Sequence, residues 1–476
     1  MSETQPLRCD RDWPEYYFEH DGKHKIVDFD PKGDPDNPMD WPKRYRWCIV
    51  LLLAFMAFTV TFTCIGLVPV ASHIVQDLEG HKDKNASVLF VTIWELGEAA
   101  GPLLIAPLSE VFGRYPVFNV CNALFIAGVV MTALSHDVSV LIFARFLTGC
   151  AVASNVLNPA VVGDIFPPES RGKAMSAVMV APLLGGAFGP AVAASFAQAT
   201  GWREVMWLAV GLAGIAELTY LTLFRETYKV PILQRRAARL RRETGDQGFR
   251  CKYDLEGAAS MSTALESMFR PFVVLSGSLI LQIMSLWGAM VFAFFYIMST
   301  TLPDMLQDVY GFDAALTGVS FMTFSVGSIF GIITCNLLVD RLYVKLQERP
   351  GDKIYPEGRL PLVVFGAFTL PFIIALYGWS AGAHFPVAVL LLAVVLMGFA
   401  MMCSVVPMLT YVTDTFELYS ASALTTVLVT RCLAGTFLPL ATSPLTNKFG
   451  YGFGFTLLAA ACLVLAPVPV CTVETL

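Results

Sequence analysis

The length, composition and charge of the chain exclude a soluble globular protein. Of its 476 residues, 55% are hydrophobic and only 15% are charged, whereas about a quarter are charged in soluble proteins. The mean hydropathy is +0.62, and so few polar side chains cannot cover the surface of water-soluble domains, so lipid is the natural solvent. The formal net charge of −6 adds little, because the position of each charge matters more than the sum.

A polar segment opens the chain without a cleavable signal, so we expect residues 1–46 to be a cytoplasmic tail. Apolar runs of about twenty residues follow, the length at which a helix crosses roughly 30 Å of hydrocarbon. One long polar stretch, residues 225–270, divides these runs into a first set of six and a second set of six. The sequence therefore predicts an all-α integral membrane protein with twelve transmembrane helices, six in a bundle over 47–224 and six in a bundle over 271–476. The approximate spans are 47–70, 88–110, 116–135, 139–163, 174–197, 203–224, 272–301, 315–339, 361–381, 386–411, 419–440 and 453–474.

Basic residues predict the orientation, because cytoplasmic loops carry more Lys and Arg than outer loops. The predicted outer loops hold only Lys82, Lys84, Arg203 and Lys448, whereas the stretch 225–270 alone holds ten Lys and Arg. Both termini and this central loop are therefore expected in the cytoplasm. The loop is either a basic, partly helical segment against anionic headgroups or a solvated linker.

The motifs that mark common enzyme chemistry are absent from the sequence. The eleven cysteines lie mostly in apolar runs without a CxxC pair, and the six histidines lie in the tail or near outer loops, so no metal site is predicted. There is no Walker loop, GxSxG or GxGxxG, which argues against ATP-driven pumping and most familiar enzymes. We therefore expect no cofactor and no nucleic-acid partner. The sequon at Asn85 falls in an outer loop, but it nearly touches the second span and we expect it to be unused.

Two patterns recur in the two predicted halves. PLSEVFGRYP (107–116) ends span 2 and NLLVDRLYVK (336–345) ends span 8, while spans 4 and 10 both end with Val-x-Asp-x-Phe. These boundary charges are either hydrated helix ends or a cluster that holds the inner face closed. The candidate gating residues are Glu110, Arg114, Asp164, Arg171, Asp340 and Arg341.

Several longer motifs resemble the major facilitator superfamily, in the form of fungal twelve-span drug:proton antiporters. They are GPLLIAPLSEVFGR (101–114), DNPMDWPKRYRW (36–47), RFLTG (145–149), PPESRGKAM (167–175), RETY (225–228), PEGRLP (356–361) and SASALTTVLVTRCLAGTFLPL (420–440). The resemblance implies two six-helix bundles around a central cavity that opens to either side in turn. It also implies efflux of drugs, toxins or secondary metabolites, usually at the plasma membrane.

Ionisable residues inside the spans are costly, so each needs a partner or a water-filled cavity. Glu95 and Glu98 lie three residues apart on one helical face, where two carboxylates disfavour simultaneous ionisation. We predict that Glu98, alone or together with Glu95, carries the coupling proton and that Arg145 is its electrostatic partner. The alternative is that Glu95, Glu98 and Arg145 form a permanent network that pins spans 2 and 4 together. Arg431 either contacts an anionic substrate or bonds helix carbonyls, and Glu217 is expected to be structural.

The resemblance also implies that spans 1, 4, 7 and 10 line the cavity. The substrate-contact candidates are then Asn155, Asn158, Gln282, Trp287, Tyr296, Met401, Met402 and Arg431. Aromatic and methionine side chains with few charges suit an amphipathic ligand.

The sequence thus predicts a monomeric secondary transporter in the plasma membrane that exports a small organic molecule against protons by alternating access. Two alternatives stay open. One is a proton-coupled importer or facilitator of an organic acid or other metabolite, and the other is a non-transporting sensor on the same scaffold.

Overall fold

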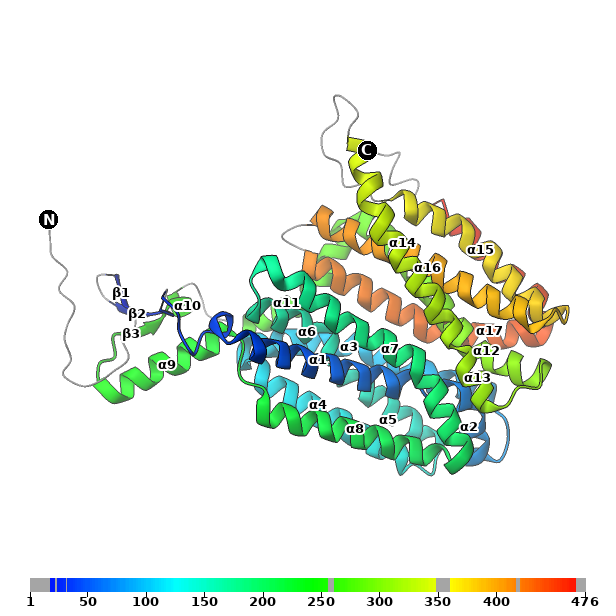
Figure 1. The fold of residues 1–476 in the computed structure, drawn as a ribbon, viewed down its shortest axis with the longest axis horizontal. Coiled ribbons are helices and arrows are strands. Elements are labelled where there is room, and N and C mark those ends of the chain that lie inside the picture. Colours follow the sequence, from blue (N-terminus) through cyan, green and yellow to red (C-terminus); the bar gives the residue numbers. More distant parts are fainter. Residues whose placement is uncertain are drawn as a thin grey trace.

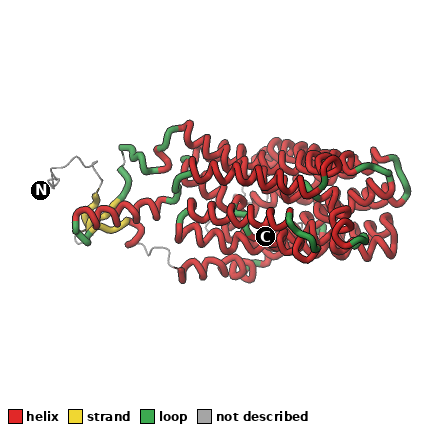
Figure 2. The backbone as a smooth tube through the Cα atoms, turned by 90° about the horizontal axis from the view of Figure 1, so that it is seen from below, coloured by secondary structure: helices red, strands yellow, loops and turns green. Residues whose placement is uncertain are grey.

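In the residues that it describes, the computed structural model is nearly all helical, and three short strands are the exception. The helices run side by side along the long axis, and the strands gather beyond one end of the bundle (Figure 1, Figure 2). The described residues are 18–21, 24–30, 32–255, 261–347, 360–416 and 420–467.

Residues 38–223 form the first half of the bundle and the turn that leads into it. Its helices are α1 (Lys43–Ile65), α2 (Ala71–Glu79), α3 (Lys84–Phe112), α4 (Arg114–Ala133), α5 (Val138–Cys150), α6 (Ser154–Ile165), α7 (Pro168–Thr200) and α8 (Trp202–Leu223), with the short 3-10 turns η1 (Pro38–Asp40) and η2 (Val68–Val70).

The second half begins inside the predicted central loop. Its helices are α11 (Met261–Gly277), α12 (Leu279–Asp304), the π-helical turn η3 (Met305–Val309), α13 (Ala314–Ser320), α14 (Met322–Gln347), α15 (Pro361–Gly382), α16 (Val387–Phe416) and α17 (Ser420–Leu465).

Eleven helical stretches of the described chain are long and apolar enough to cross a membrane. The last, α17, has 46 residues, about 69 Å of helix at 1.5 Å per residue and twice the thickness of the hydrocarbon core. It breaks at Gly450, whose φ of 74° and ψ of 172° are not helical. Its two arms fall on the predicted spans 419–440 and 453–474, so the expected twelve-helix membrane fold is confirmed.

The bundle presents large apolar side chains outward, as a protein in lipid must. Leu218, Phe372 and Val464 are 62%, 70% and 76% exposed, and each belongs to one of the membrane-crossing stretches. In water such a surface would expose a contiguous apolar patch far larger than monomeric soluble proteins carry.

The same helix pairings occur in both halves. In the first half α1 packs on α7, α3 on α5, and α4 on α8; in the second half α12 packs on the first arm of α17, α14 on α16, and α15 on the second arm. The two halves meet where α3 packs on α17 and where α7 packs on α13. This correspondence agrees with the repeated motifs of the sequence and places α3 at the boundary between the halves.

The predicted span 139–163 lies within one membrane-crossing stretch, Val138–Ile165, but residues 151–153 between α5 and α6 are not helical and divide it. Just before this break the backbones of α3 and α5 nearly touch. A Cβ atom on Gly97 would lie 2.6 Å from the Cys150 nitrogen, and one on Gly149 would lie 3.1 Å from the Gly97 Cα. Glycine at both positions permits this approach, which sets the start of α6 beside α3.

A small module forms beyond the bundle from the two polar parts of the chain. β1 (Phe18–Asp21) pairs antiparallel with β2 (His24–Val27), and β2 pairs parallel with β3 (Phe249–Cys251) from the central loop. α9 (Lys229–Thr244) covers the sheet, and α10 (Lys252–Leu255) follows β3. Val27, Ala237, Leu240 and Phe249 form its apolar core. The alternative of a solvated linker is therefore wrong for α9, whose apolar side meets protein.

A buried ion pair joins the two segments of this module. Both terminal nitrogens of Arg236 bond the Asp34 carboxylate, at 2.6 and 2.9 Å, and one of them also bonds Asp36 at 2.9 Å. Burial alone would raise the pKa of Asp34, but hydrogen bonds from Arg236 and from the Asp36 amide outweigh it and hold that pKa below its ordinary value. The carboxylate is therefore ionised at neutral pH, and the pair persists.

Polar contacts fasten the two halves at the end opposite to the module, which we call the far seam (Figure 1). In each contact one residue comes from the first half and one from the second. The pairs are Ser72–Asp304 (3.3 Å), His73–Gln307 (3.1 Å), Lys82–Asp308 (3.7 Å) and Gln198–Asp313 (3.4 Å). The structure is thus closed at this end.

Replacing Arg236 with Met is expected to unfold the module and leave the bundle intact. The buried Asp34 would lose its partner, which costs about 3–5 kcal/mol for a buried ion pair. Hydrogen exchange of the β2 and β3 amides should accelerate strongly, while exchange in α12 and α17 stays slow. Arg235→Met, on the exposed side of α9, is the matched control; equal exchange in both variants would show that the pair does not hold the module.

Candidate functional site

Two buried carboxylates lie at the boundary between the two halves. Glu95 and Glu98 are on α3, the helix that packs on α17, and their exposed fractions are only 1% and 3%. The predicted spacing of three residues places both on one face of the helix, and that face meets the second half of the bundle.

Donors from the second half bond both carboxylates. The Tyr296 hydroxyl of α12 donates to Glu95 Oε1 at 2.5 Å, and Arg431 Nη2 of α17 lies 3.3 Å from Glu98 Oε1. Asn155 of α6 donates its amide to the same Glu98 oxygen at 2.5 Å. We call Glu95, Glu98, Tyr296 and Arg431 the central cluster; it ties α3 to α12 and α17.

The thiol of Cys432 completes the surroundings of the two carboxylates. The ligand atoms of Glu95, Glu98 and Cys432 all lie within 4.8 Å of one another, close enough to hold a metal ion. The guanidinium of Arg431 already supplies a positive charge beside Glu98 and would repel a cation. Cys432 was not among the predicted site residues, because a cysteine in an apolar run looks like any other small buried side chain.

The charges of the central cluster do not balance when both carboxylates are ionised. One guanidinium faces two carboxylates that are themselves almost fully buried, where an uncompensated charge is expensive. The cluster is neutral when one of the carboxylates holds a proton. The arrangement can therefore bind and release a proton at the boundary between the two halves.

Arg145 does not pair with either carboxylate, contrary to the sequence prediction. Its terminal nitrogens donate to the backbone carbonyls of Thr63 at 2.9 Å and Cys64 at 2.6 Å, and its Nε donates to that of Phe90 at 3.5 Å. The first two carbonyls belong to the last turn of α1, where helical carbonyls lack partners and the helix dipole is negative. Arg145 therefore caps α1, and the roles expected of Arg145 and Arg431 are exchanged.

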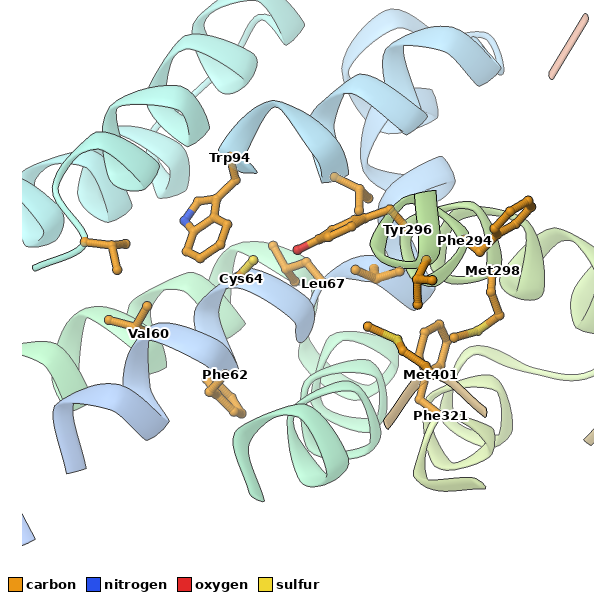
Figure 3. Close-up of a cluster of buried hydrophobic side chains, with 14 of the residues drawn as sticks. Val60, Phe62, Cys64, Leu67, Trp94, Phe294, Tyr296, Met298, Phe321 and Met401 are labelled. Carbon is orange, nitrogen blue, oxygen red and sulfur yellow. The ribbon is translucent and has the colours of Figure 1, made fainter. Parts of the chain in front are cut away.

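The remaining cavity candidates do not form one surface. Asn155 is exposed, but Asn158, Trp287 and Met401 are almost fully buried, and Met401 belongs to the apolar core drawn in Figure 3. Tyr296 reaches in the same view from α12 toward Trp94 and Cys64 of the first half (Figure 3).

Two further cavity candidates serve local packing. Gln282 donates to the Leu275 carbonyl at 3.0 Å and bridges the break between α11 and α12. The backbone carbonyl of Met402 accepts a contact from the Cys335 thiol at 3.5 Å, which joins α16 to α14.

The predicted gating residues meet only in part. Arg114 Nε lies 3.4 Å from Asp164 Oδ2, and a terminal nitrogen of Arg114 also bonds the Ser109 hydroxyl. Arg171 instead donates to the carbonyls of Gly163 and Phe166. Glu110 is exposed, and the side chains of Asp340 and Arg341 lie outside the described residues.

Glu226 completes this group and was not predicted, although it belongs to the quoted motif RETY. Its carboxylate accepts the backbone N–H groups of Arg114 at 2.8 Å and Tyr115 at 3.2 Å, which open α4. It also accepts the amides of Thr227 and Tyr228, while the Thr227 hydroxyl bonds Asp164 at 3.2 Å. The segment that leads from α8 to the module is thus fixed to the first half.

Two other predicted positions lie away from the central cluster. Asn85 is exposed in the first turn of α3, where the Asp83 carboxylate accepts its backbone N–H at 2.8 Å. Glu217 of α8 accepts a hydrogen bond from Asn122 of α4 at 2.8 Å, within the first half.

Comparison with known proteins gives consistent matches. The family model described as Major Facilitator Superfamily matches residues 48–439. The efflux pump radE of Floropilus chiversii is 33% identical over 93% of this chain and 82% of its own length, and the MFS-type transporter atr4 of Stereocaulon alpinum is 35% identical over 93% and 80%.

Solved structures share the fold at low identity. The D-xylose-proton symporter superimposes with a TM-score of 0.65 at 15% identity, over 89% of this chain and 97% of its own. The peptide transporter POT gives the same TM-score at 16% identity, over 90% and 94%.

Substitution of the two buried arginines should separate their roles. Arg145→Met leaves carbonyls at the end of α1 without donors, so we expect thermal stability in detergent to fall by about 2–3 kcal/mol. Arg431→Met should lower it less, because Glu98 can bind a proton when its partner is removed. Thermal unfolding of both purified variants measures the difference, and a larger loss for Arg431→Met would contradict the assignment.

Proposed function

Because the chain belongs to the major facilitator superfamily of membrane transporters, we propose that it exports a small organic molecule, such as a drug, toxin or secondary metabolite, in exchange for protons. The superfamily and its named relatives make it a transporter of small molecules and not an enzyme. The export direction is supported by the relative radE, which is named an efflux pump.

Two hydrogen bonds between the halves support proton coupling. In each, a donor from the second half binds a carboxylate of the first half. Arg431 is held to Glu98 at 3.3 Å and Tyr296 to Glu95 at 2.5 Å. Hydrogen bonds to an ionised carboxylate are roughly twice as strong as neutral ones. Protonation of a carboxylate therefore weakens a bond between the halves directly.

Alternating access follows from this dependence on charge. When Glu98 is ionised, its pairing with Arg431 favours the close contact of α3 and α17 seen here. When Glu98 binds a proton, the pair loses its charge attraction and the halves can separate at this point. One proton bound on one side of the membrane and released on the other then drives one cycle.

The surroundings of the cluster suit an amphipathic substrate. Asn155 is exposed, the Arg431 side chain is 27% exposed, and the guanidinium of Arg431 lies 4.2 Å from the centre of the Phe292 ring. Phe295 and Phe324 pack nearby with tilted rings whose centres are 4.9 Å apart. A ligand with an aromatic body and a polar group would contact the rings and the amide together.

The orientation in the membrane is also a proposal. The excess of Lys and Arg in the central loop supports a cytoplasmic module and cytoplasmic termini, so that the far seam faces outward. The structure, closed at the far seam, would then represent a state closed to the outside. We further propose that the protein acts as a monomer in the plasma membrane.

Glu98→Gln should abolish pH-gradient-driven transport and preserve substrate binding. The substitution keeps the shape of the side chain but removes its charge and its proton, so uphill transport should fall at least tenfold, while exchange of labelled for unlabelled substrate continues. The measurement uses vesicles of known orientation, with a substrate first identified by comparing metabolites inside and outside cells that lack or overexpress the protein. Glu217→Gln is the matched control, because Glu217 bonds only within the first half.

Undiminished uphill transport by the Glu98→Gln variant, with its pH dependence unchanged, would refute coupling through Glu98. Net movement in the direction of the proton flux would instead favour the importer. Specific binding without any flux would favour the sensor.

A further inference from the structure

A small cavity lies between the two halves at the far seam. Its volume is about 20 Å³, enough for one water molecule, and it has polar groups from both halves. Ser72, Lys84 and Ser87 line it from the first half, and Thr300 and Asp304 line it from the second. The seam is therefore a polar contact that water or a proton can reach, and not a sealed apolar joint.

Asp304 is the acidic residue that lines this cavity. Its Oδ1 accepts a hydrogen bond from the Ser72 hydroxyl at 3.3 Å across the seam. Lys82 and Lys84 attract its charge, and Asp308 repels it. Tyr377 of α15 and Tyr451 of α17 also face it. An ionised Asp304 is thus attracted to lysines and a hydroxyl of the first half.

The neighbouring seam contacts of Lys82 and His73 are more exposed than this one. Lys82 and Asp308 are 55% and 53% exposed and lie 3.7 Å apart, so water and salt screen their attraction. The bond between His73 and Gln307 is exposed as well. Asp304 is half-buried, so water and salt screen its attraction to the first half less than they screen the pair Lys82–Asp308. The amide of Gln307, which donates to the Pro69 carbonyl at 3.0 Å, is a second partly buried bond of this seam.

We propose that Asp304 is a proton-operated latch of the far seam. Ionised, it accepts the hydrogen bond of Ser72, is attracted to Lys84 across the cavity and keeps this end closed; protonated, it loses its attraction to the lysines and the end opens. The latch is separate from the central cluster, and it responds to the pH on the side that the seam faces. In an exporter driven by inward proton flow, acid outside would thereby open the end through which substrate leaves and protons enter.

The test follows opening of the seam without measuring transport. Val88 lines the cavity and is 8% exposed, so a cysteine in its place should react with a membrane-impermeant maleimide only when the seam opens. Lowering the external pH should raise the labelling rate of Val88→Cys, divided by that of Thr200→Cys, about tenfold. This is the size expected for the loss of one hydrogen bond to a charged group. Thr200 is exposed at the end of α7, so its cysteine corrects for the pH dependence of the thiol itself.

Variants assign the effect to Asp304. Asp304→Asn in the Val88→Cys background should label fast at every pH, and Ser72→Ala should label faster while keeping part of the pH response. Asp308→Asn and His73→Gln should keep the full response, which separates the latch from the neighbouring titratable groups. If Asp304→Asn does not fold, the Ser72→Ala variant decides by itself. The proposal is overturned if Ser72→Ala leaves the labelling rate of Val88→Cys unchanged at every pH.

A pH response that survives in Asp304→Asn, or no pH response in Val88→Cys alone, would likewise overturn the latch. Neither outcome depends on proton-coupled export. The two proposals can therefore fail separately. Transport tests of Glu98→Gln decide proton coupling, and the labelling tests of Val88→Cys decide the latch.

Discussion

The cost of placing charge in hydrocarbon decides the structure of this bundle. The acidic and basic side chains that the sequence places within the spans are bonded to other helices, because an unpaired charge there would cost at least about 2.5 kcal/mol even on insertion scales. Arg145 meets this constraint with backbone carbonyls of α1, and Glu217 with the Asn122 amide. Glu98 meets it with Arg431, the pair that joins one half of the bundle to the other.

This pairing explains how a static network and a moving transporter are compatible. Bonds within one half, such as Arg145 to Thr63 or Arg114 to Asp164, move with that half as it rotates. In the proposed cycle the bonds between the halves break, and at two places these bonds include a titratable carboxylate. The central cluster and the far seam both follow this pattern, with Glu98 and Asp304 as the acidic groups.

Outside the bundle, backbone pairing and a buried ion pair hold the module together. Two polar segments more than 200 residues apart come together because β2 and β3 pair and because Arg236 bonds Asp34 in a buried position. Glu226, on the linking segment, caps α4 and fixes the module to the first half. α11, which follows the module in the chain, packs on both α3 of the first half and α17 of the second.

The sequence alone determined the membrane class, the number of crossings and the place of the central loop, since apolar length and charge are local properties that a window of twenty residues contains. It also identified Glu95, Glu98 and Arg431 as costly residues that need partners. Only the tertiary structure decided which partner each one has. Arg145 was expected beside the carboxylates, yet it bonds the end of α1. Arg431, which does bond Glu98, is more than 300 residues away in sequence. The break between α5 and α6, the Glu226 cap and the three-stranded sheet likewise depend on contacts between distant segments, and the periodicity of a single segment carries no record of them.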